Sequence, residues 1–297
     1  MCGIVGLFAK SPAVEAEMGA HLSAMLITMS DRGPDSAGFA IYRDPAPGAV
    51  KVTLQSPDPE TDFADLASDL ASLGIETLGL EQVETHAILR LASDKGLREA
   101  LAEIRPDIRV MSRGNAIEIY KEVGLPEQVA ERFALASMSG THAVGHTRMA
   151  TESAVTTLGA HPFSTAPDQC LVHNGSMSNH NNMRRELAHA GMAVETENDT
   201  EVAAAYLSWR MAGGENLGQA LQHGLKDYDG FYTFLVGTGT GFGVLRDPIA
   251  CKPAVMAETD DYVAFGSEYR ALVSLPGIET AKVWEPEPAT VYFWERS

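Results

Sequence analysis

The stretch MCGIVGLF (residues 1–8) opens the chain and places a cysteine directly before a run of small and apolar residues. Such a run predicts a buried strand. If Met1 is removed, Cys2 carries a thiol and a free α-amino group on the same carbon atom. The reference pKa of an α-amino group, about 7.7–8.0, is close to the value of about 8.5 for a thiol. The amine can therefore accept the thiol proton through a water molecule, which predicts that Cys2 is an N-terminal nucleophile.

The overall composition is typical of a soluble globular protein. The chain has 297 residues, of which 21% are charged, and its net charge is −18. This acidity argues against nucleic acid or an anionic membrane as a partner, because phosphate groups are bound by clustered Lys and Arg. No apolar run approaches the roughly 20 residues of a membrane span, and the N-terminus does not have the pattern of a secretory signal.

The three cysteines, Cys2, Cys170 and Cys251, lie far apart and form no CxxC motif. This spacing argues against both a disulfide framework and a zinc site. We therefore expect a reducing, cytoplasmic compartment and no metal ion in this chain.

Hydrophobic periodicity divides the chain into an outer frame and an insertion. Residues 12–29 carry apolar side chains at helical spacing, and residues 38–42 and 50–55 have the composition of strands. From about residue 56 to 140, helical segments alternate with strand-like ones, which predicts a small α/β insertion packed on the main domain. The later part of the chain predicts strands at 143–148, 169–173, 231–237 and 241–246 and helices at about 179–190 and 199–211.

Three stretches in the second half carry groups that a thiol nucleophile needs. Arg148 ends a predicted strand, where a guanidinium can bind a carboxylate bidentately. Asn174 and Gly175 follow the next strand, where a side-chain amide and a backbone N–H can point at one oxyanion. Asp199 begins a helix and can face an ammonium group. Each stretch also has a structural interpretation: a surface arginine, an ordinary Asn-Gly turn, and a helix start with favourable capping and charge.

Six motifs in this order resemble those of the class II glutamine amidotransferases, which use an N-terminal cysteine. They are residues 1–6, 32–38, 145–151, 160–162, 172–175 and 198–201. The resemblance covers about residues 2–50 and 142–297. It implies an α+β fold, the four-layer αββα sandwich of the N-terminal-nucleophile (Ntn) hydrolases. One amidotransferase domain would then span residues 2–297, with the small α/β insertion at 56–140 within it.

The resemblance also implies a role for each group of the three stretches. Cys2 is the nucleophile and its own α-amine is the base. Asn174 and Gly175 form the oxyanion hole. Arg148 binds the α-carboxylate of glutamine, and Asp199 binds its α-amino group.

Three further residues are implied to border the substrate. Thr151 and His161 line the pocket, and Arg32 belongs to the loop that closes over it. The chain departs from the family pattern at two positions: many members have Trp where this chain has Met149, and His where it has Glu152. These departures concern loop closure and the contact with a synthase domain more than hydrolysis itself.

The chain ends soon after the amidotransferase domain, so we expect another protein to use the ammonia. The insertion and the ending at residues 265–272 resemble stand-alone amidotransferase subunits of the glutamate synthase type, in particular the small amidotransferase-like subunit of N-methylglutamate synthase. The resemblance implies a synthase subunit that carries FMN and a further subunit with the glutamate-synthase β-helix domain. An iron–sulfur cluster would also belong to a partner, and no cofactor is expected in this chain.

Two other functions stay open at this point. One is a non-catalytic subunit that senses glutamine or acts as a scaffold in the same complex. The other is a self-sufficient glutaminase that needs no partner. The sequence does not identify the acceptor reaction. Ammonia-dependent glutamate synthesis, methylamine chemistry and a reaction with another amine all stay open.

Overall fold

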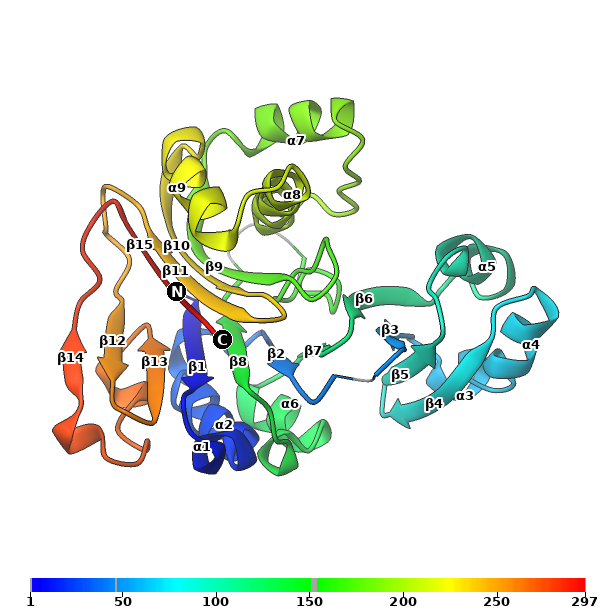
Figure 1. Cartoon of the computed structure of the whole chain (residues 1–297), viewed down its shortest axis with the longest axis horizontal. Helices are drawn as coiled ribbons and strands as arrows, with labels where there is room; N and C mark the ends of the chain where they lie inside the picture. Colours follow the sequence, from blue (N-terminus) through cyan, green and yellow to red (C-terminus); the bar gives the residue numbers. More distant parts are fainter. Residues whose placement is uncertain (1, 46, 151–153, 297) are drawn as a thin grey trace.

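The computed structural model describes residues 2–45, 47–150 and 154–296, and within these ranges the largest sheet has the strand order β14-β12-β13-β1-β8-β2-β7 (Figure 1). Its strands are β1 (Gly3–Ala9), β2 (Ser36–Tyr42), β7 (Ile117–Val123), β8 (His142–Arg148), β12 (Val255–Glu258), β13 (Tyr262–Gly266) and β14 (Lys282–Trp284). The opening run of the sequence is β1, which pairs antiparallel with β13 on one side and β8 on the other. The start of the chain therefore lies in the middle of the sheet.

A second sheet, with the order β15-β11-β10-β9, packs on the first. Its strands are β9 (Cys170–Met177), β10 (Gly230–Gly237), β11 (Gly241–Arg246) and β15 (Thr290–Glu295). Ile4 and Phe8 of β1 share a buried core with Leu235 and Phe242 of this sheet. Between them, a Cβ atom at Gly6 would lie 2.4 Å from the Leu235 side chain, so glycine permits the close approach of the two sheets.

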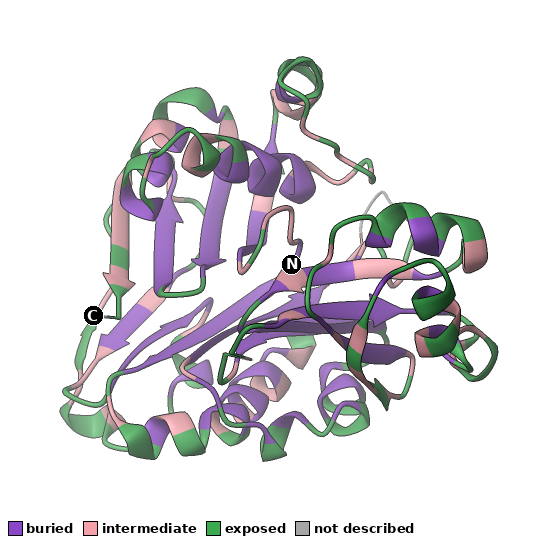
Figure 2. Ribbon diagram, turned by 45° about the vertical axis from the view of Figure 1, so that its right-hand side comes forward, coloured by how far each residue is buried: buried purple, intermediate pink, exposed green. Residues whose placement is uncertain are grey.

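Helices cover the outer face of each sheet (Figure 2). The first sheet is covered by α1 (Pro12–Ala16), α2 (Met18–Thr28) and α6 (Pro126–Arg132), and the second by α7 (His180–His189), α8 (Asp199–Ala212) and α9 (Leu217–Asp227). Short 3-10 helices lie at Ser30–Arg32, Leu135–Ser137, Tyr269–Ala271 and Ile278–Thr280. Alternate residues of β1, Val5 and Leu7, pack against α2 rather than against the second sheet, which explains why the run is apolar throughout. The predicted αββα sandwich is confirmed.

The insertion has a sheet and a core of its own, on the right of Figure 1. The sheet has the order β4-β5-β3-β6, formed by β3 (Val50–Gln55), β4 (Thr77–Val83), β5 (His86–Leu91) and β6 (Arg109–Gly114). Helices α3 (Pro59–Asp62), α4 (Leu66–Ser72) and α5 (Leu97–Ile104) accompany it. Leu54, Leu70, Leu89 and Leu101 belong to its separate hydrophobic core.

The structure corrects both bounds of the predicted insertion, residues 56–140. At the first bound, β3 lies inside the insertion, between β5 and β6. At the second, β7 pairs with β2 of the main sheet, and the ring of Tyr120 lies 5.4 Å from that of Phe39 and 5.2 Å from that of Phe133. Alternation of helices and strands does not reveal which sheet a strand joins, since that choice depends on its partners in space.

No helix in the described part of the chain is long and apolar enough to cross a lipid bilayer.

Candidate active site

Cys2 lies directly before the central strand β1, and hydrogen bonds hold its backbone from two sides. Its carbonyl oxygen accepts from Nε of Arg32 at 2.9 Å and from Nδ2 of Asn174 at 3.2 Å. Two residues further, the N–H of Ile4 donates to Oγ of Ser267 at 2.9 Å, and the Ile4 carbonyl accepts from the Ser267 N–H at 2.9 Å. The start of β1 is therefore fixed in place, while Cys2 itself is only partly buried.

A cavity of about 730 Å³ opens beside Cys2 and gathers residues that are distant in the sequence. The predicted site residues that line it are Cys2, Arg148, His161, Asn174, Gly175 and Asp199. Thr151, which was also expected to line the pocket, lies outside the described residues, as do Met1 and Glu152. The three separate motifs that carry a guanidinium, an amide and a carboxylate thus meet at one thiol.

Arg32, which was expected to belong to the loop that closes over the pocket, lies behind Cys2. It is only 7% exposed and is not among the residues that line the Cys2 cavity. Its Nη1 lies 2.6 Å from Oε1 of Glu268, and this contact, together with the nearby Arg270, lowers the pKa of the Glu268 carboxyl. Because its Nε holds the Cys2 carbonyl, Arg32 positions the nucleophile from behind rather than contacting the cavity.

The end of β8 carries Arg148 to the cavity, and the turn before β2 fixes it there. The N–H of Asp35 donates to the Arg148 carbonyl at 3.1 Å, and Oδ2 of Asp35 accepts from the N–H of Ala150 at 2.8 Å. The Arg148 side chain is 7% exposed, and its Nη1 donates to the carbonyl of Ala154 at 3.3 Å. A guanidinium at the wall of the cavity has the planar donor geometry that suits a ligand carboxylate.

Asn174 and Gly175 lie on β9, where the strand passes Cys2. An amide nitrogen carries two hydrogens; one from Nδ2 of Asn174 goes to the Cys2 carbonyl, which leaves the second for a ligand. Gly175 has φ +147°, and a Cβ atom there would lie 2.0 Å from the carbonyl oxygen of Phe231. The backbone conformation therefore requires glycine at position 175. An amide donor and a backbone N–H beside a thiol are the components of an oxyanion hole.

Gly175→Ala is expected to lower the free energy of unfolding by about 2–6 kcal/mol. About 1–3 kcal/mol comes from a side chain at positive φ, and about 1–3 kcal/mol from the overlap with Phe231. Chemical denaturation measures the change. Gly74→Ala is the matched control, because Gly74 has φ +80° but nothing within 4 Å of its Cβ position. Equal destabilisation by the two variants would contradict the proposed overlap.

Asp199 lies in the first turn of α8, where its contacts favour the ionised carboxylate. Oδ1 of Asn198 caps the helix by accepting from the N–H of Thr200 at 2.9 Å. Oδ2 of Asp199 accepts from the N–H of Met177 at 2.9 Å, and its Oδ1 lies 3.5 Å from Nδ1 of His173. Burial alone would raise the pKa of Asp199, but the contacts with His173 and Met177 outweigh it and lower the pKa to about 2. The carboxylate is therefore charged at neutral pH and suits an ammonium group.

Three buried histidines support this wall of the cavity. The rings of His146 and His161 stack at 4.0 Å, and Nε2 of His146 lies 3.0 Å from the carbonyl oxygen of His173. Oγ1 of Thr200 lies 3.1 Å from Nδ1 of His173 and 3.3 Å from Nε2 of His161. Burial lowers the pKa of His146 to about 3 and that of His161 well below its ordinary value. Neutral rings at these two positions hold β8, β9 and α8 together rather than transfer protons.

The sequence prediction included His161 but missed His146 and His173. Both stand inside predicted motifs, two residues before Arg148 and directly before Asn174. Their position inside these motifs was the sequence signal that could have identified them as site residues. The described residues contain no group of three or more His, Cys, Asp or Glu side chains placed to hold a metal ion.

Sequence comparisons identify relatives along almost the whole chain. The profile of the glutamine amidotransferase domain matches residues 134–293. The chain is 65% identical to the glutamine amidotransferase-like protein GlxB of Rhizobium meliloti (strain 1021), over 99% of this chain and 98% of that relative. It is 34% identical to a putative glutamine amidotransferase of Methanothermobacter thermautotrophicus, over 99% of this chain and 100% of that protein.

The structure is similar to that of the glutamine phosphoribosylpyrophosphate amidotransferase from B. subtilis, with a TM-score of 0.60 at 19% sequence identity. The match covers 99% of this chain and 47% of the longer enzyme, so it supports the fold and not the acceptor chemistry. The domain profile, the relatives of equal length and the αββα fold agree, and the chain belongs to the class II glutamine amidotransferases of the Ntn-hydrolase fold.

Proposed function

We propose that this protein hydrolyses glutamine through a thioester on Cys2 and supplies the ammonia or glutamate to a partner synthase. The observation that carries the proposal is the convergence of a thiol, an oxyanion hole and two opposite charges on one cavity. Arg148 and Asp199 suit the α-carboxylate and α-ammonium groups of an amino acid. With those two groups held, the side-chain carboxamide of glutamine can extend toward Cys2.

In the first half of the reaction, the α-amine of the processed chain accepts the Cys2 proton, and Sγ attacks the carboxamide carbon of glutamine. The resulting oxyanion accepts hydrogen bonds from Nδ2 of Asn174 and the N–H of Gly175. When the C–N bond breaks, ammonia leaves with the proton from the α-ammonium group. A γ-glutamyl thioester remains on Cys2.

In the second half, water attacks the thioester carbon and gives a proton to the α-amine. The same two donors stabilise the second oxyanion. The C–S bond then breaks, glutamate leaves, and the α-ammonium returns its proton to the thiolate. Glutamine and water have become glutamate and ammonia, with the enzyme restored and no external base required.

We further propose that the partners are an FMN-bearing synthase subunit and a glutamate-synthase β-helix-type subunit, as the sequence resemblance to N-methylglutamate synthase implies. FMN and any iron–sulfur cluster would be held by those partners. Met149 and Leu158 line the Cys2 cavity yet are 37% and 39% exposed, and apolar side chains at a cavity rim suit coverage by another chain. A cytoplasmic location fits, because a reducing compartment keeps the Cys2 thiol free.

Purification of the chain from its own cells tests this function. We expect it to elute on size exclusion with a flavin-containing partner and to support glutamine-dependent formation of an aminated product from glutamate, methylamine and related acceptors. Cys2→Ala should assemble equally well and abolish the glutamine-dependent reaction, while added ammonium salt or methylamine restores the synthase reaction.

Two outcomes would contradict the proposal in different ways. Full glutamine-dependent activity of the Cys2→Ala complex would identify a scaffolding or sensing subunit. Elution of an active glutaminase without any partner would identify a self-sufficient enzyme and remove the synthase part of the proposal.

A further inference from the structure

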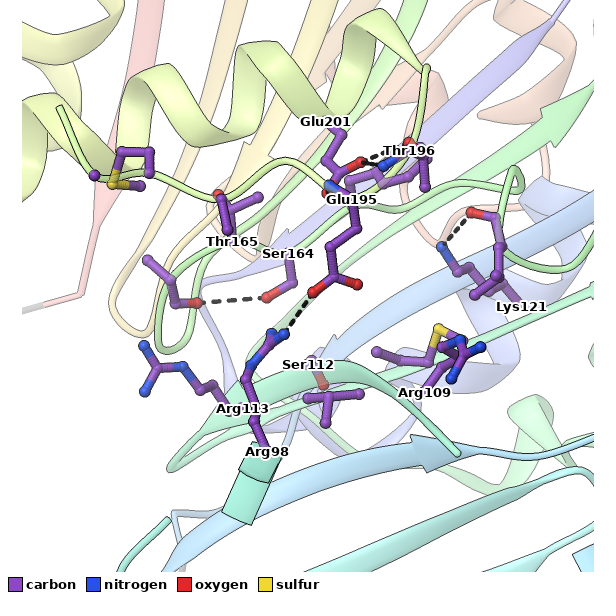
Figure 3. A pocket seen from close by; sticks show the side chains of 18 residues that line it. Arg98, Arg109, Ser112, Arg113, Lys121, Ser164, Thr165, Glu195, Thr196 and Glu201 are labelled. Carbon is purple, nitrogen blue, oxygen red and sulfur yellow. Dashed lines mark hydrogen bonds and ion pairs between the residues drawn. The ribbon is translucent and has the colours of Figure 1, made fainter. Parts of the chain in front are cut away.

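A second cavity, of about 350 Å³, lies between the insertion and the main body (Figure 3). On the insertion side it is lined by Arg98 of α5 and by Arg109 and Arg113 of β6. The main body contributes Lys121 of β7 and two connecting segments, residues 163–166 and 191–196. This volume is at the lower end of the range for small-molecule pockets, about 300–1,000 Å³.

The cavity gathers positive charge in a protein that is otherwise acidic. The chain has 22 Lys and Arg against 40 Asp and Glu. Around this cavity the ratio reverses, since four cationic side chains face two carboxylates, Glu195 and Glu201. Both oxygens of Glu201 are occupied: they accept from the N–H of Glu195 at 2.7 Å and from the N–H and hydroxyl of Thr196 at 2.6 and 2.5 Å.

Two of the three arginine side chains can leave their present partners and bind a ligand at little cost in free energy. In Figure 3, Arg98 reaches across the cavity to Glu195, an ion pair of 2.5 Å whose side chains are 58% and 55% exposed. Such exposed pairs contribute little to stability. Arg109 donates to the backbone carbonyls of Pro106 and Ile108 and forms no ion pair with a carboxylate of the described residues. Arg113 pairs with Asp94 at 2.9 Å.

Lys121 is a buried cation at the edge of the same cavity. It is 4% exposed, and its Nζ donates to the carbonyls of Leu158 at 3.3 Å, Ala160 at 2.8 Å and Pro162 at 3.1 Å. Within the described ranges no carboxylate forms an ion pair with it. Burial lowers the pKa of Lys121 to about 7, with the more distant Glu201 opposing that change. An anion in the adjoining cavity would offset this buried charge.

The same lysine connects the cavity to the Cys2 site. The carbonyls that it holds belong to residues 158–162, and this segment carries His161 into the wall of the Cys2 cavity. Leu158 and Thr196 line both cavities. The two cavities therefore share a wall that depends on Lys121.

We propose that this second cavity binds a small oxyanion ligand with at least two negative charges, a dicarboxylate or a phosphate compound, and that the bound anion steadies residues 158–163. Arg98 and Arg109 bind its oxygens, because guanidinium groups match the planar and bidentate geometry of carboxylate and phosphate. The ammonium of Lys121 stays on its three carbonyls and contributes its charge. This inference does not depend on the glutamine chemistry proposed above.

The test titrates the otherwise unaltered protein calorimetrically with inorganic phosphate and separately with succinate. We expect saturable binding of at least one of them, weakened at least about tenfold by Arg98→Ala or Arg109→Ala. Arg185→Ala is the control, because Arg185 is exposed on α7 and does not line this cavity. Phosphate binding alone would indicate a phosphorylated ligand, and succinate binding alone a dicarboxylate.

Hydrogen exchange supplies the second readout. Saturation with the bound anion should slow amide exchange in residues 158–163 and leave α7 unchanged. Binding of neither anion, or binding that neither arginine variant weakens, would overturn the proposed site. Binding without slower exchange in residues 158–163 would overturn the proposed effect on the shared wall. Because none of these readouts involves glutamine, they stay informative even if the proposed glutaminase function fails.

Discussion

Cys2→Ala is expected to reduce glutamine hydrolysis by about 10⁴-fold or more, because removal of a covalent nucleophile eliminates the reaction path itself. The variant should fold normally, since the hydrogen bonds of Cys2 that hold the start of β1 come from its backbone carbonyl. Release of glutamate and ammonia measures the activity, and thermal unfolding monitors the fold.

Cys251→Ala is the matched control for this experiment. Cys251 is exposed and does not line the Cys2 cavity, so its replacement should leave turnover unchanged. If Cys2→Ala retained more than a small fraction of the activity, another nucleophile would have to be found. The fully buried Cys170 would be a poor substitute, because burial raises the pKa of its thiol to about 12.

Asn174→Ala is expected to reduce kcat for glutamine by about 10²–10³-fold, the usual effect of removing one oxyanion-hole donor. The change should fall on kcat more than on KM, since the oxyanion exists only in the transition state and intermediates. Steady-state kinetics over a range of glutamine concentrations separate the two constants. Asn182→Ala, an exposed amide on α7, should be nearly neutral.

Because Asn174 also holds the Cys2 carbonyl, its loss could act by displacing the nucleophile. Alkylation of the Cys2 thiol by iodoacetamide distinguishes the two effects. Arg32 still binds the same carbonyl in this variant, so we expect the alkylation rate to stay close to that of the unaltered protein. A strong fall in alkylation together with kcat would show that Asn174 positions Cys2, and an unchanged kcat would exclude it from the oxyanion hole.

The sequence predicts the central residues of this site well, because short local patterns identify them. Cys2 before an apolar strand, the Asn174-Gly175 pair and the acidic start of α8 each have a recognisable physical signature within a few residues. The prediction that these residues lie in one site came from the family resemblance rather than from the local patterns. Nothing local in the sequence shows that β8 and β9 belong to different sheets that face each other across Cys2.

What the sequence could not predict depends on contacts between distant residues. The sequence resemblance placed Arg32 in the pocket-closing loop but did not show its contacts with Glu268 and the Cys2 carbonyl. These contacts depend on the fold, because the buried guanidinium pairs with a carboxylate that lies 236 positions away in the chain. The insertion bounds failed for the same reason, since only spatial pairing places β7 beside β2.

The central claim is that the free N-terminal cysteine attacks glutamine, and covalent trapping tests it most directly. The protein is incubated with a diazo-ketone analogue of glutamine, digested and analysed by mass spectrometry. The account predicts one label per chain, on a peptide that begins with Cys2 and lacks Met1, and protection of that label by excess glutamine. A label on any other residue, or glutamine hydrolysis by protein that retains Met1, would contradict it.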